Sequence, residues 1–339
     1  MMYLLVLFFL WTQGFAEQIN LEERPQPFVI RTKKIEIPGY PHAFNPSIVR
    51  WQDRLLLSFR VIPDRKDSFT SWIGLIELDE QFNPIGELQK IEMREPGSSI
   101  PCRAEDARML MVGESLYLIY SDNEEKKISR GGFRVYAAEL ICHGERFVLQ
   151  DTECLSIFEG ESREKREKNW TPFDFKGNLL LAYSLSPHKI LCPIFGTQEC
   201  ITIAETDRPF SWYWGELRGG TPALRTEDGD YLAFFHSSIL MATIHSEEQS
   251  IFHYFTGAYT FSAYPPFALT RISQEPIVAP GFYSGASYQP YWKNVKVIFP
   301  CGYLYDGASL FLAYGRDDHE IWIAELDTRS FFDSLNQIN

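Results

Sequence analysis

The sequence predicts an all-β fold, a five-bladed β-propeller, because of its strand pattern, its internal repeat and a constant spacing inside that repeat. Long amphipathic helical patterns are scarce. Short alternating apolar runs separated by Gly, Pro, Asn and Asp are frequent, which is typical of β-strands. Five such runs carry an aromatic residue next to their last position: DRLLLSFR (53–60), ESLYLIYS (114–121), GNLLLAYS (177–184), GDYLAFFH (229–236) and ASLFLAYG (308–315).

A polar or Pro-containing entry into a strand precedes each of these aromatic residues at a constant distance. Counting back 14 residues from each aromatic gives the five entry positions Asn45, Asp106, Asn169, Thr221 and Pro300. A third strand recurs as WIGLIELD, FRVYAAEL, CITIAETD and IWIAELD. The repeating unit is therefore a meander of about four strands. Such units bury both of their faces when they pack around a common axis, as in a propeller. A β-sandwich with coincidental similarity is the alternative.

We expect one propeller domain over residues 17–339, because five blades across residues 40–327 fit one domain. The predicted blades cover roughly residues 40–95, 100–150, 165–207, 215–265 and 290–327. The segment PFVIRTKKIEI, which precedes the first blade, is expected to add a strand to the last blade and so close the ring.

The N-terminus predicts export. An apolar run from Met1 to Trp11 is too short to span a bilayer, and Gly14-Phe15-Ala16 has the small-x-small form of a cleavage site. We read residues 1–16 as a cleaved signal peptide and expect a secreted, periplasmic or lumenal protein without stable membrane insertion. A buried N-terminal strand is the alternative, since no Lys or Arg precedes the run.

Charge and cysteine content limit the partners. The formal net charge is −13, so an acidic surface repels phosphate backbones and nucleic acid is not expected to bind, whereas neutral sugars are not disfavoured. The six cysteines form no CxxC pair, and no His pair stands at ligand spacing, so neither a metal nor another cofactor is expected. Cys192 and Cys200 are the first candidates for a disulfide in an exported chain.

The repeat also predicts a site. Innermost propeller strands begin near the central channel, so the five entry positions should converge there, with Asp106 as the acid of the second repeat. The residues that follow the aromatics, including Arg60, Ser184 and His236, should lie close to the same face. A turn residue whose carboxylate caps local N–H groups is the alternative for Asp106.

Six segments in order resemble glycoside hydrolase family 130, whose hydrolases and phosphorylases are five-bladed propellers that act on β-mannosides. These segments are AEDAR (104–108), EKNWTPF (167–173), RGGTPALRTEDGDYLAFFHS (218–237), YFTGAYTF (254–261), VIFPCGYLY (297–305) and YGRDDHEIWIAEL (314–326). AEDAR is similar to the family's Glu-Asp-Pro-Arg element, with Ala107 in place of proline. The resemblance covers roughly residues 40–327.

The resemblance implies an inverting enzyme with Asp106 as the general acid. Together with the repeat, it suggests a set of substrate-binding residues, which are Asn45, Arg60, Glu105, Asn169, Thr221 and Asp318. It also implies phosphate ligands if the reaction is phosphorolytic, namely Lys168, His188 and Arg108, because a phosphate needs several converging cationic donors. Glu216 is a further candidate, as a base that activates water, and Trp170 and Tyr259 could stack on sugars or pack between blades.

Three functions stay open at this point. The first is an exported enzyme that cleaves β-mannosidic or related glycosides, by hydrolysis or with inorganic phosphate as a co-substrate. The second is a mannosyltransferase on the same scaffold. The third is a non-catalytic propeller that binds sugars, to which Ala107 gives weight.

Overall fold

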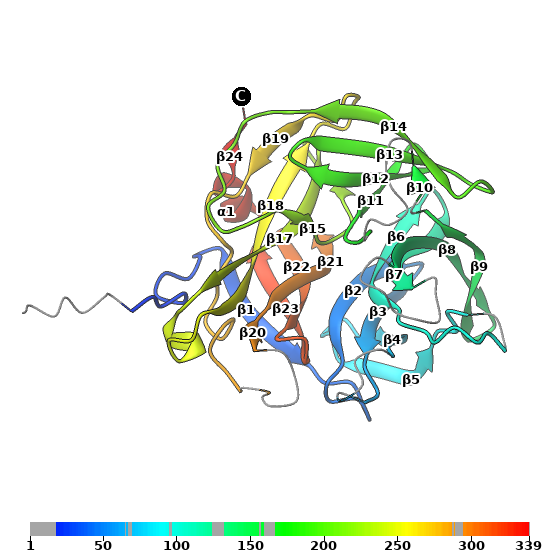
Figure 1. Ribbon diagram of the computed structural model, residues 1–339, viewed down its shortest axis with the longest axis horizontal. Coiled ribbons are helices and arrows are strands. Elements are labelled where there is room, and N and C mark those ends of the chain that lie inside the picture. Colours follow the sequence, from blue (N-terminus) through cyan, green and yellow to red (C-terminus); the bar gives the residue numbers. More distant parts are fainter. Residues whose placement is uncertain are drawn as a thin grey trace, which may run out of the picture.

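The computed structural model describes residues 18–338, except for 65, 67–69, 95–96, 124–131, 156, 159–166, 287 and 289–293. The predicted signal peptide lies outside the described residues. Within the described residues the strands form five sheets, which stand around a common centre (Figure 1).

Three sheets are antiparallel meanders that begin with their innermost strand. Sheet 1 consists of β2 (Phe44–Trp51), β3 (Arg54–Val61), β4 (Trp72–Leu78) and β5 (Pro84–Lys90). Sheet 2 consists of β6 (Glu105–Val112), β7 (Ser115–Asn123), β8 (Phe133–His143) and β9 (Arg146–Cys154). Sheet 3 consists of β11 (Thr171–Phe175), β12 (Asn178–Leu185), β13 (His188–Ile194) and β14 (Glu199–Thr206), and β10 (Ile157–Phe158) pairs in parallel with β14.

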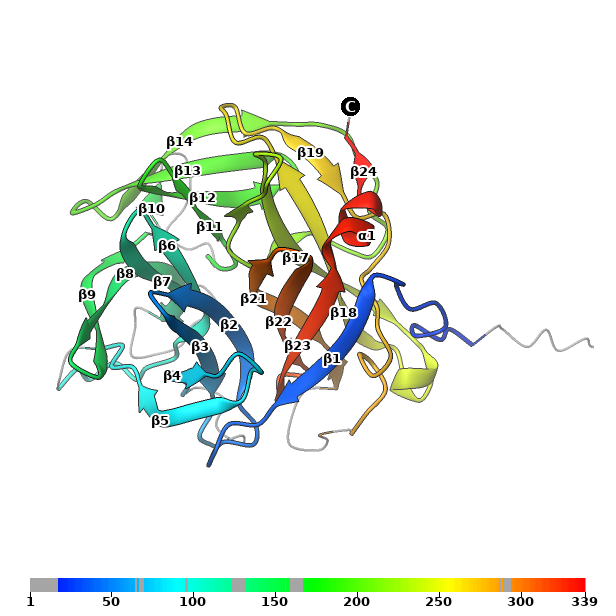
Figure 2. The ribbon, with the colours of Figure 1, turned by 180° about the vertical axis from the view of Figure 1, so that it is seen from behind.

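The last sheet of the chain closes the ring. Sheet 5 consists of β21 (Ile298–Asp306), β22 (Ser309–Arg316), β23 (Glu320–Asp327) and β1 (Val29–Ile35). The N-terminal strand β1 runs antiparallel to β23, and Figure 2 shows the two side by side. The prediction that PFVIRTKKIEI adds a strand to the last blade is therefore confirmed.

Sheet 4 departs from the repeat. Its strands are β15 (Arg218–Gly219), β16 (Leu224–Arg225), β17 (Tyr231–Met241), β18 (Ile251–Phe261), β19 (Leu269–Ile272), β20 (Val295–Lys296) and β24 (Asn336–Gln337). The hairpin β17–β18 is extended beyond the ring and carries a short 3₁₀ helix, η1 (Ile244–Ser246), at its tip. The helix α1 (Thr328–Asp333) connects β23 to β24.

The all-β class and the propeller-like arrangement are thus as predicted, but the number of blades is not. Within the described residues four sheets contain the four-stranded meander of a blade, to which sheet 3 adds β10, where the sequence predicted five blades. Sheet 4 differs because its inner strand is split and β20 and β24 join it. The third-strand prediction was also wrong in one repeat. CITIAETD forms β14, the fourth strand of sheet 3, since the unrecognised strand β13 precedes it.

Apolar side chains fill the space between neighbouring sheets. Leu55 and Leu57 of β3 pack toward sheet 5, where they meet Ile323, whereas Leu56 points the other way and packs toward Met109 of sheet 2. This division follows from the two-residue period of a strand. Corresponding clusters lie between sheets 2 and 3, 3 and 4, and 4 and 5, so each sheet is buried on both faces.

The same period explains why the expected Cys192–Cys200 disulfide is absent and both thiols are free. Cys192 stands opposite Ile201 in the β13–β14 pairing, so Cys200 faces the other side of sheet 3. Accordingly Cys192 packs against the cluster between sheets 3 and 4, and Cys200 belongs to the cluster between sheets 2 and 3. Two thiols on opposite faces of one sheet cannot be bridged without moving the backbone.

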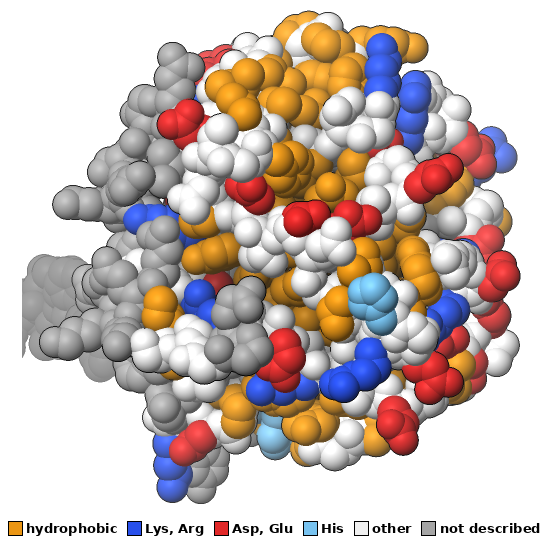
Figure 3. All heavy atoms as spheres, turned by 90° about the vertical axis from the view of Figure 1, so that its right-hand side faces the viewer, with side chains coloured by type: hydrophobic (Ala, Val, Ile, Leu, Met, Phe, Trp, Pro, Cys, Tyr) orange, Lys and Arg blue, Asp and Glu red, His pale blue; other side chains and the backbone are white. Residues whose placement is uncertain are grey.

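The outer surface is mixed in character. On the side seen in Figure 3, hydrophobic side chains gather toward the top and charges of both signs gather below. Outer strand β14 contributes the exposed residues Ile201 and Ile203. Among the described residues no helix has the length and hydropathy needed to cross a bilayer.

Candidate functional site

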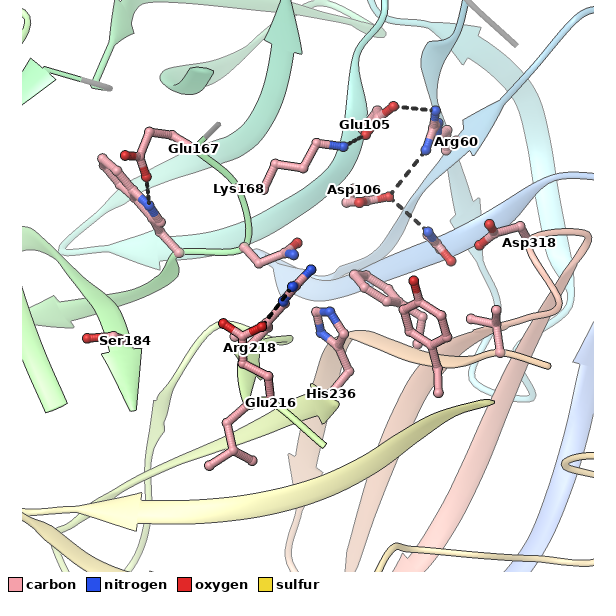
Figure 4. Close-up of a pocket in the computed structure, with 18 of the residues that line it drawn as sticks. Arg60, Glu105, Asp106, Glu167, Lys168, Ser184, Glu216, Arg218, His236 and Asp318 are labelled. Atoms are coloured by element: carbon pink, nitrogen blue, oxygen red, sulfur yellow. Dashed lines mark hydrogen bonds and ion pairs between the residues drawn. The ribbon is translucent and has the colours of Figure 1, made fainter. Parts of the chain in front are cut away.

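A cavity of about 670 Å³ is lined by residues from the inner strands of the sheets and from the segments that lead into them (Figure 4). Its charged and amide-bearing lining residues are Asn45, Arg60, Arg103, Glu105, Asp106, Glu167, Lys168, Asn169, Glu216, Arg218, His236 and Asp318. Its other walls are formed by Trp170, Tyr183, Ser184, Leu217, Gly219, Tyr254, Val295, Val297 and Phe299. Seven of the ten residues predicted for the site line this cavity, and they come from segments that are far apart in the sequence.

Three entry positions share an unusual backbone conformation. Asn45, Asp106 and Asn169 have φ of 48°, 54° and 63°, in the left-handed region that Asn and Asp tolerate better than most residues. In β2 and β6 the strand register shifts at this point, which is the signature of a β-bulge. Because the bulge interrupts the alternation of side chains, the consecutive residues Glu105 and Asp106 both reach the cavity.

Glycines leave room for two of these turns. A Cβ on Gly315 would lie 2.1 Å from Oδ1 of Asn45, and a Cβ on Gly219 would lie 2.2 Å from the carbonyl oxygen of Asn169. A side chain at either position would therefore displace the entry residue of the neighbouring sheet. The close approach of the backbones requires glycine here.

Glu105 is surrounded by three cations. Its carboxylate forms an ion pair of 2.8 Å with Arg60, an ion pair of 3.4 Å with Arg103 and a close ion pair with Lys168. Two of these cations also lie near the ring of Phe133, with the Arg103 guanidinium 4.7 Å and the Lys168 ammonium 4.0 Å from its centroid. Glu105 therefore fixes the positions of charged groups that come from three different sheets or their entries.

Asp106 is held by an amide and a guanidinium. The Asn45 side-chain amide donates a hydrogen bond of 2.8 Å to its Oδ1, and an Arg60 nitrogen lies 3.8 Å from the same oxygen. Burial lowers the pKa of Arg60, and the nearby carboxylates of Asp106 and Asp318 oppose this shift. The carboxylate is thus oriented at the cavity wall, where a bound ligand would meet it (Figure 4).

Other charged groups line the cavity away from this cluster. Glu216 and Arg218 form an exposed ion pair of 3.0 Å, on the opposite side of the cavity from Asp106 in Figure 4. Glu167 is buried and accepts a hydrogen bond of 3.2 Å from the indole of Trp170. Glu167 therefore lines the cavity beside Lys168, a position that the sequence did not predict.

His236 lies at the cavity wall as a buried neutral ring. Burial lowers its pKa to about 3, and the nearby cations Arg108 and Arg218 add to the shift. Its ring packs 4.4 Å from the ring of Phe299 and 6.2 Å from that of Tyr254. Together with Arg60 and Ser184, His236 confirms the prediction that residues following the repeat aromatics lie at one face.

Three predicted site residues do not line the cavity. Arg108 is buried beneath it, where its guanidinium donates to the carbonyls of Asp106, Gly219 and Gly220 and to the side chain of Asn169. It does not pair with Glu105. Thr221 is fully buried, and its hydroxyl accepts a hydrogen bond of 3.0 Å from the Phe234 N–H.

His188 is the third residue outside the cavity. Its ring hydrogen-bonds the Phe267 carbonyl at 2.8 Å and packs against Phe261 and Tyr259 between sheets 3 and 4. Burial lowers its pKa to about 4, so the ring is neutral at physiological pH. A buried neutral ring cannot supply the cationic donor expected of a phosphate ligand, and the position of His188 therefore argues against that role. Tyr259 is likewise buried between these sheets, where it packs rather than meeting a sugar.

Several lining residues were not predicted from the sequence, including Arg103, Glu167, Tyr183 and Tyr254. For two of them, the sequence contains a feature from which a place in the site could have been predicted. Tyr183 is itself a repeat aromatic, and Arg103 stands two residues before Glu105 in the same entry segment. Tyr254 lies on the extended hairpin of sheet 4, whose geometry the repeat does not describe. In the described part of the chain, no group of three or more His, Cys, Asp and Glu side chains is arranged to hold a metal.

The fold and sequence match known proteins. A family model described as beta-1,4-mannooligosaccharide phosphorylase, of glycoside hydrolase family 130, matches residues 15–337. A beta-1,2-mannobiose phosphorylase from Listeria innocua, solved with beta-1,2-mannobiose, has a TM-score of 0.57 at 17% identity, covering 91% of this chain and 94% of its own. No curated protein matches the sequence significantly.

Two Leishmania mexicana structures are similar at lower identity. The mannose phosphorylase MPT-4, solved with a phosphate ion, has a TM-score of 0.59 at 12% identity and covers 92% of each chain. The GDP-Man-dependent mannosyltransferase MPT-1 has a TM-score of 0.61 at 9% identity, covering 88% of this chain and 90% of its own. At these identities the structural matches show the fold alone. The family match extends over nearly the whole chain, and the chain therefore belongs to glycoside hydrolase family 130, among the glycosidases and glycoside phosphorylases.

Proposed function

We propose that the cavity cleaves β-mannosidic bonds by an inverting mechanism in which Asp106 is the general acid. The observation that carries the proposal is the position of Asp106 in the cavity wall, oriented by Asn45 and Arg60 at the end of a bulged strand. Glycosyl transfer requires an acid on the departing oxygen and a nucleophile on the opposite face of the sugar ring. The family of mannooligosaccharide phosphorylases and the two similar phosphorylases support a mannoside as the substrate.

The lining residues supply the remaining roles. Asn45, Asn169 and Asp318 offer amide and carboxylate groups that suit sugar hydroxyls, and Tyr183 offers a ring for the apolar face of a pyranose. With water as the nucleophile, Glu216 is the carboxylate placed across the cavity to activate it. With phosphate as the co-substrate, Lys168 and Arg103 are the cations that would bind the anion. No other cofactor is required by either route.

The test is to incubate the protein with β-1,2- and β-1,4-mannobiose, with and without inorganic phosphate, and to identify the products. Hydrolysis yields mannose alone and should be lost in Glu216→Gln, since that substitution removes the base. Phosphorolysis yields mannose 1-phosphate, depends on phosphate and should survive Glu216→Gln. A protein that turns over neither disaccharide under either condition would contradict the proposal.

A mannosyltransferase is the second candidate, favoured by the fold shared with MPT-1. Its distinguishing product is a lengthened mannoside formed from GDP-mannose or mannose 1-phosphate. Transfer from GDP-mannose without cleavage of the mannobioses would replace the first proposal by this one. Sugar binding that persists in Asp106→Asn, with no turnover by the wild type, would instead identify a sugar-binding propeller.

We also propose that the protein is exported, because the apolar run of Met1–Trp11 and the Gly14-Phe15-Ala16 site have the form of a signal peptide. Expression in a secreting host followed by N-terminal sequencing tests this. A mature chain that begins near Glu17 is expected. A secreted or retained chain that still begins with Met1 would contradict cleavage.

A further inference from the structure

A second cavity of about 300 Å³ lies beside the extended hairpin of sheet 4. It is lined by three segments, which are the hairpin tip, the loop at 283–285 and the stretch around β20. The lining residues used below are Glu247, Gln249, Tyr283, Ser284, Asn294 and Lys296. None of them lines the cavity that contains Asp106.

Lys296 gives this cavity a buried positive charge. The residue is only 9% exposed, and its ammonium lies among the residues that line the cavity. The nearest carboxylate oxygen, from Asp317, is 3.9 Å away, which is beyond hydrogen-bond distance. An ammonium carries three N–H donors, and at 3.9 Å the Asp317 carboxylate accepts none of them, so they are available to a molecule in the cavity. Lys296 is therefore suited to donate to a ligand in the cavity.

The neighbouring groups provide both donors and acceptors. The Asn294 amide donates a hydrogen bond of 2.7 Å to Oε1 of Gln249, which leaves the amide nitrogen of Gln249 and the carbonyl of Asn294 at the rim. The exposed Glu247 carboxylate adds an acceptor. A ligand with several hydroxyl groups, each both donor and acceptor, can satisfy such a mixed lining.

The charge around the cavity selects a neutral ligand. Asp317 lies beside Lys296, Glu247 lies at the rim, and Glu22 lies behind Ser284, whose N–H and hydroxyl it accepts. An anion would thus face three carboxylates and a single ammonium. A neutral polyhydroxylated molecule meets no such repulsion, and a monosaccharide unit is of the size that such a cavity admits.

The two cavities share a wall. Val295 and Val297 line the cavity of Asp106, whereas Lys296 between them points into the second cavity, as the alternation of side chains along a strand requires. Behind this wall the Tyr283 hydroxyl donates a hydrogen bond of 3.0 Å to the carbonyl of Tyr254, which lines the first cavity. A ligand in the second cavity would therefore sit directly behind the proposed active site.

We propose that the second cavity is a separate binding site for a neutral glycosyl unit, with Lys296 as its central donor and Asn294 and Gln249 at its rim. This proposal rests on the proposed function only in the choice of mannosides as the sugar. It predicts that one chain binds two sugar units at independent sites, one of which takes no part in cleavage.

The experiment measures binding of β-1,2- and β-1,4-mannobiose to the Asp106→Asn protein by isothermal titration calorimetry, so that turnover does not interfere. We expect two sites per chain. Adding Lys296→Met should weaken one site about tenfold or more, because a charged hydrogen bond is lost, and leave the other unchanged. Lys90→Met, which alters an exposed lysine on β5, is the matched control and should leave both sites unchanged.

A second variant guards against misfolding of the Lys296→Met protein. Asn294→Ala changes a rim residue, should retain the melting temperature of its parent and should also weaken one site selectively. Crystals of the Asp106→Asn protein soaked with mannobiose should show a sugar in contact with the Lys296 ammonium. A single site per chain, or two sites that are insensitive to both substitutions, would overturn the proposal. Binding of inorganic phosphate at Lys296 in place of sugar would overturn it as well.

The test of the second binding site and the test of the proposed function can fail independently of each other. Turnover by the wild type with one binding site in the Asp106→Asn protein rejects the second site alone. Two binding sites with no turnover by the wild type reject the enzymatic proposal alone and support the second site.

Discussion

The entry turns of the first three repeats and those of the last two occupy the same place in the sequence but different environments. Asn45, Asp106 and Asn169 have left-handed backbone and line the cavity. Thr221 and Pro300 stand at the same offset, lack the left-handed conformation and are buried outside the cavity lining. A spacing in the sequence thus locates the turn, but the local backbone conformation decides whether its side chain faces a ligand or the core.

The reason lies in the residue types. Asn and Asp adopt positive φ at low cost, whereas a β-branched threonine or a proline does not. In the first three repeats the turn therefore exposes a polar side chain to the cavity. In the fourth the Thr221 hydroxyl instead accepts the Phe234 N–H and becomes part of the sheet.

The largest expected effect is at Asp106. Asp106→Asn keeps the size of the side chain and the tolerance for positive φ, but it removes the acid. If Asp106 is the general acid, kcat for mannobiose cleavage should fall by about 10²–10⁴ with little change in melting temperature. Steady-state kinetics and thermal unfolding of the same preparation measure both quantities. Unchanged turnover would remove the catalytic role.

The next effect concerns His188, a predicted site residue that the structure places in the core. Its pKa is about 4 in the folded protein and ordinarily near 6.5, so between these values the unfolded chain binds more protons than the folded one. Its contribution to stability is therefore complete above about pH 6.5 and is lost as the pH falls toward 4. The lost contribution is of order 3 kcal/mol.

Replacing His188 by Phe should remove this loss. The free energy of unfolding, from urea titrations at pH 7 and pH 4.5, should fall less on acidification in His188→Phe than in the wild type. The turnover number at pH 7 should stay within about threefold, because the ring does not line the cavity. If His188→Phe instead lost phosphate-dependent turnover while its stability was unchanged, His188 would have to be regarded as a phosphate ligand again.

Thr221→Val tests whether the entry residue of the fourth repeat serves the core of the sheet and not the cavity. The substitution keeps the shape of the side chain but leaves the Phe234 N–H without the hydroxyl that accepts it, which should cost about 1–3 kcal/mol of stability. The free energy of unfolding from chemical denaturation gives this value. The ratio kcat/KM per folded molecule should hardly change, and a large rise in KM would instead show that Thr221 binds the substrate.

The smallest expected effect is the difference in stability between an alanine and a glycine substitution, measured at each of two entry positions. At Asn169, where φ is 63°, alanine should be less stable than glycine by about 1 kcal/mol, because a Cβ is disfavoured in the left-handed region. At Thr221 the order should reverse, with glycine less stable than alanine by about 0.5–1 kcal/mol. Denaturant titrations of the four variants measure the two differences, and the same order at both positions would break the comparison.

Strand pattern and repeat spacing were enough to predict the all-β class, the propeller-like arrangement and the ring-closing strand, because alternation and turn residues act locally. They were not enough for sheet 4, where β20 and β24 join from distant parts of the chain, nor for β13, whose residues HKILCPI do not resemble the repeat. The expected disulfide failed for a related reason. Closeness in sequence did not reveal that Cys192 and Cys200 face opposite sides of one sheet.

The sequence by itself determined which residues open each repeat and which follow each aromatic, and so it named Asp106, Asn45, Arg60 and Asn169 as neighbours. The tertiary structure alone decided that three cations meet Glu105, that Arg108 and His188 serve the interior, and that Lys296 faces a second cavity. Periodicity is a local property of the chain. Burial, ion pairing and the direction of a side chain at a bulge depend on how separate sheets meet.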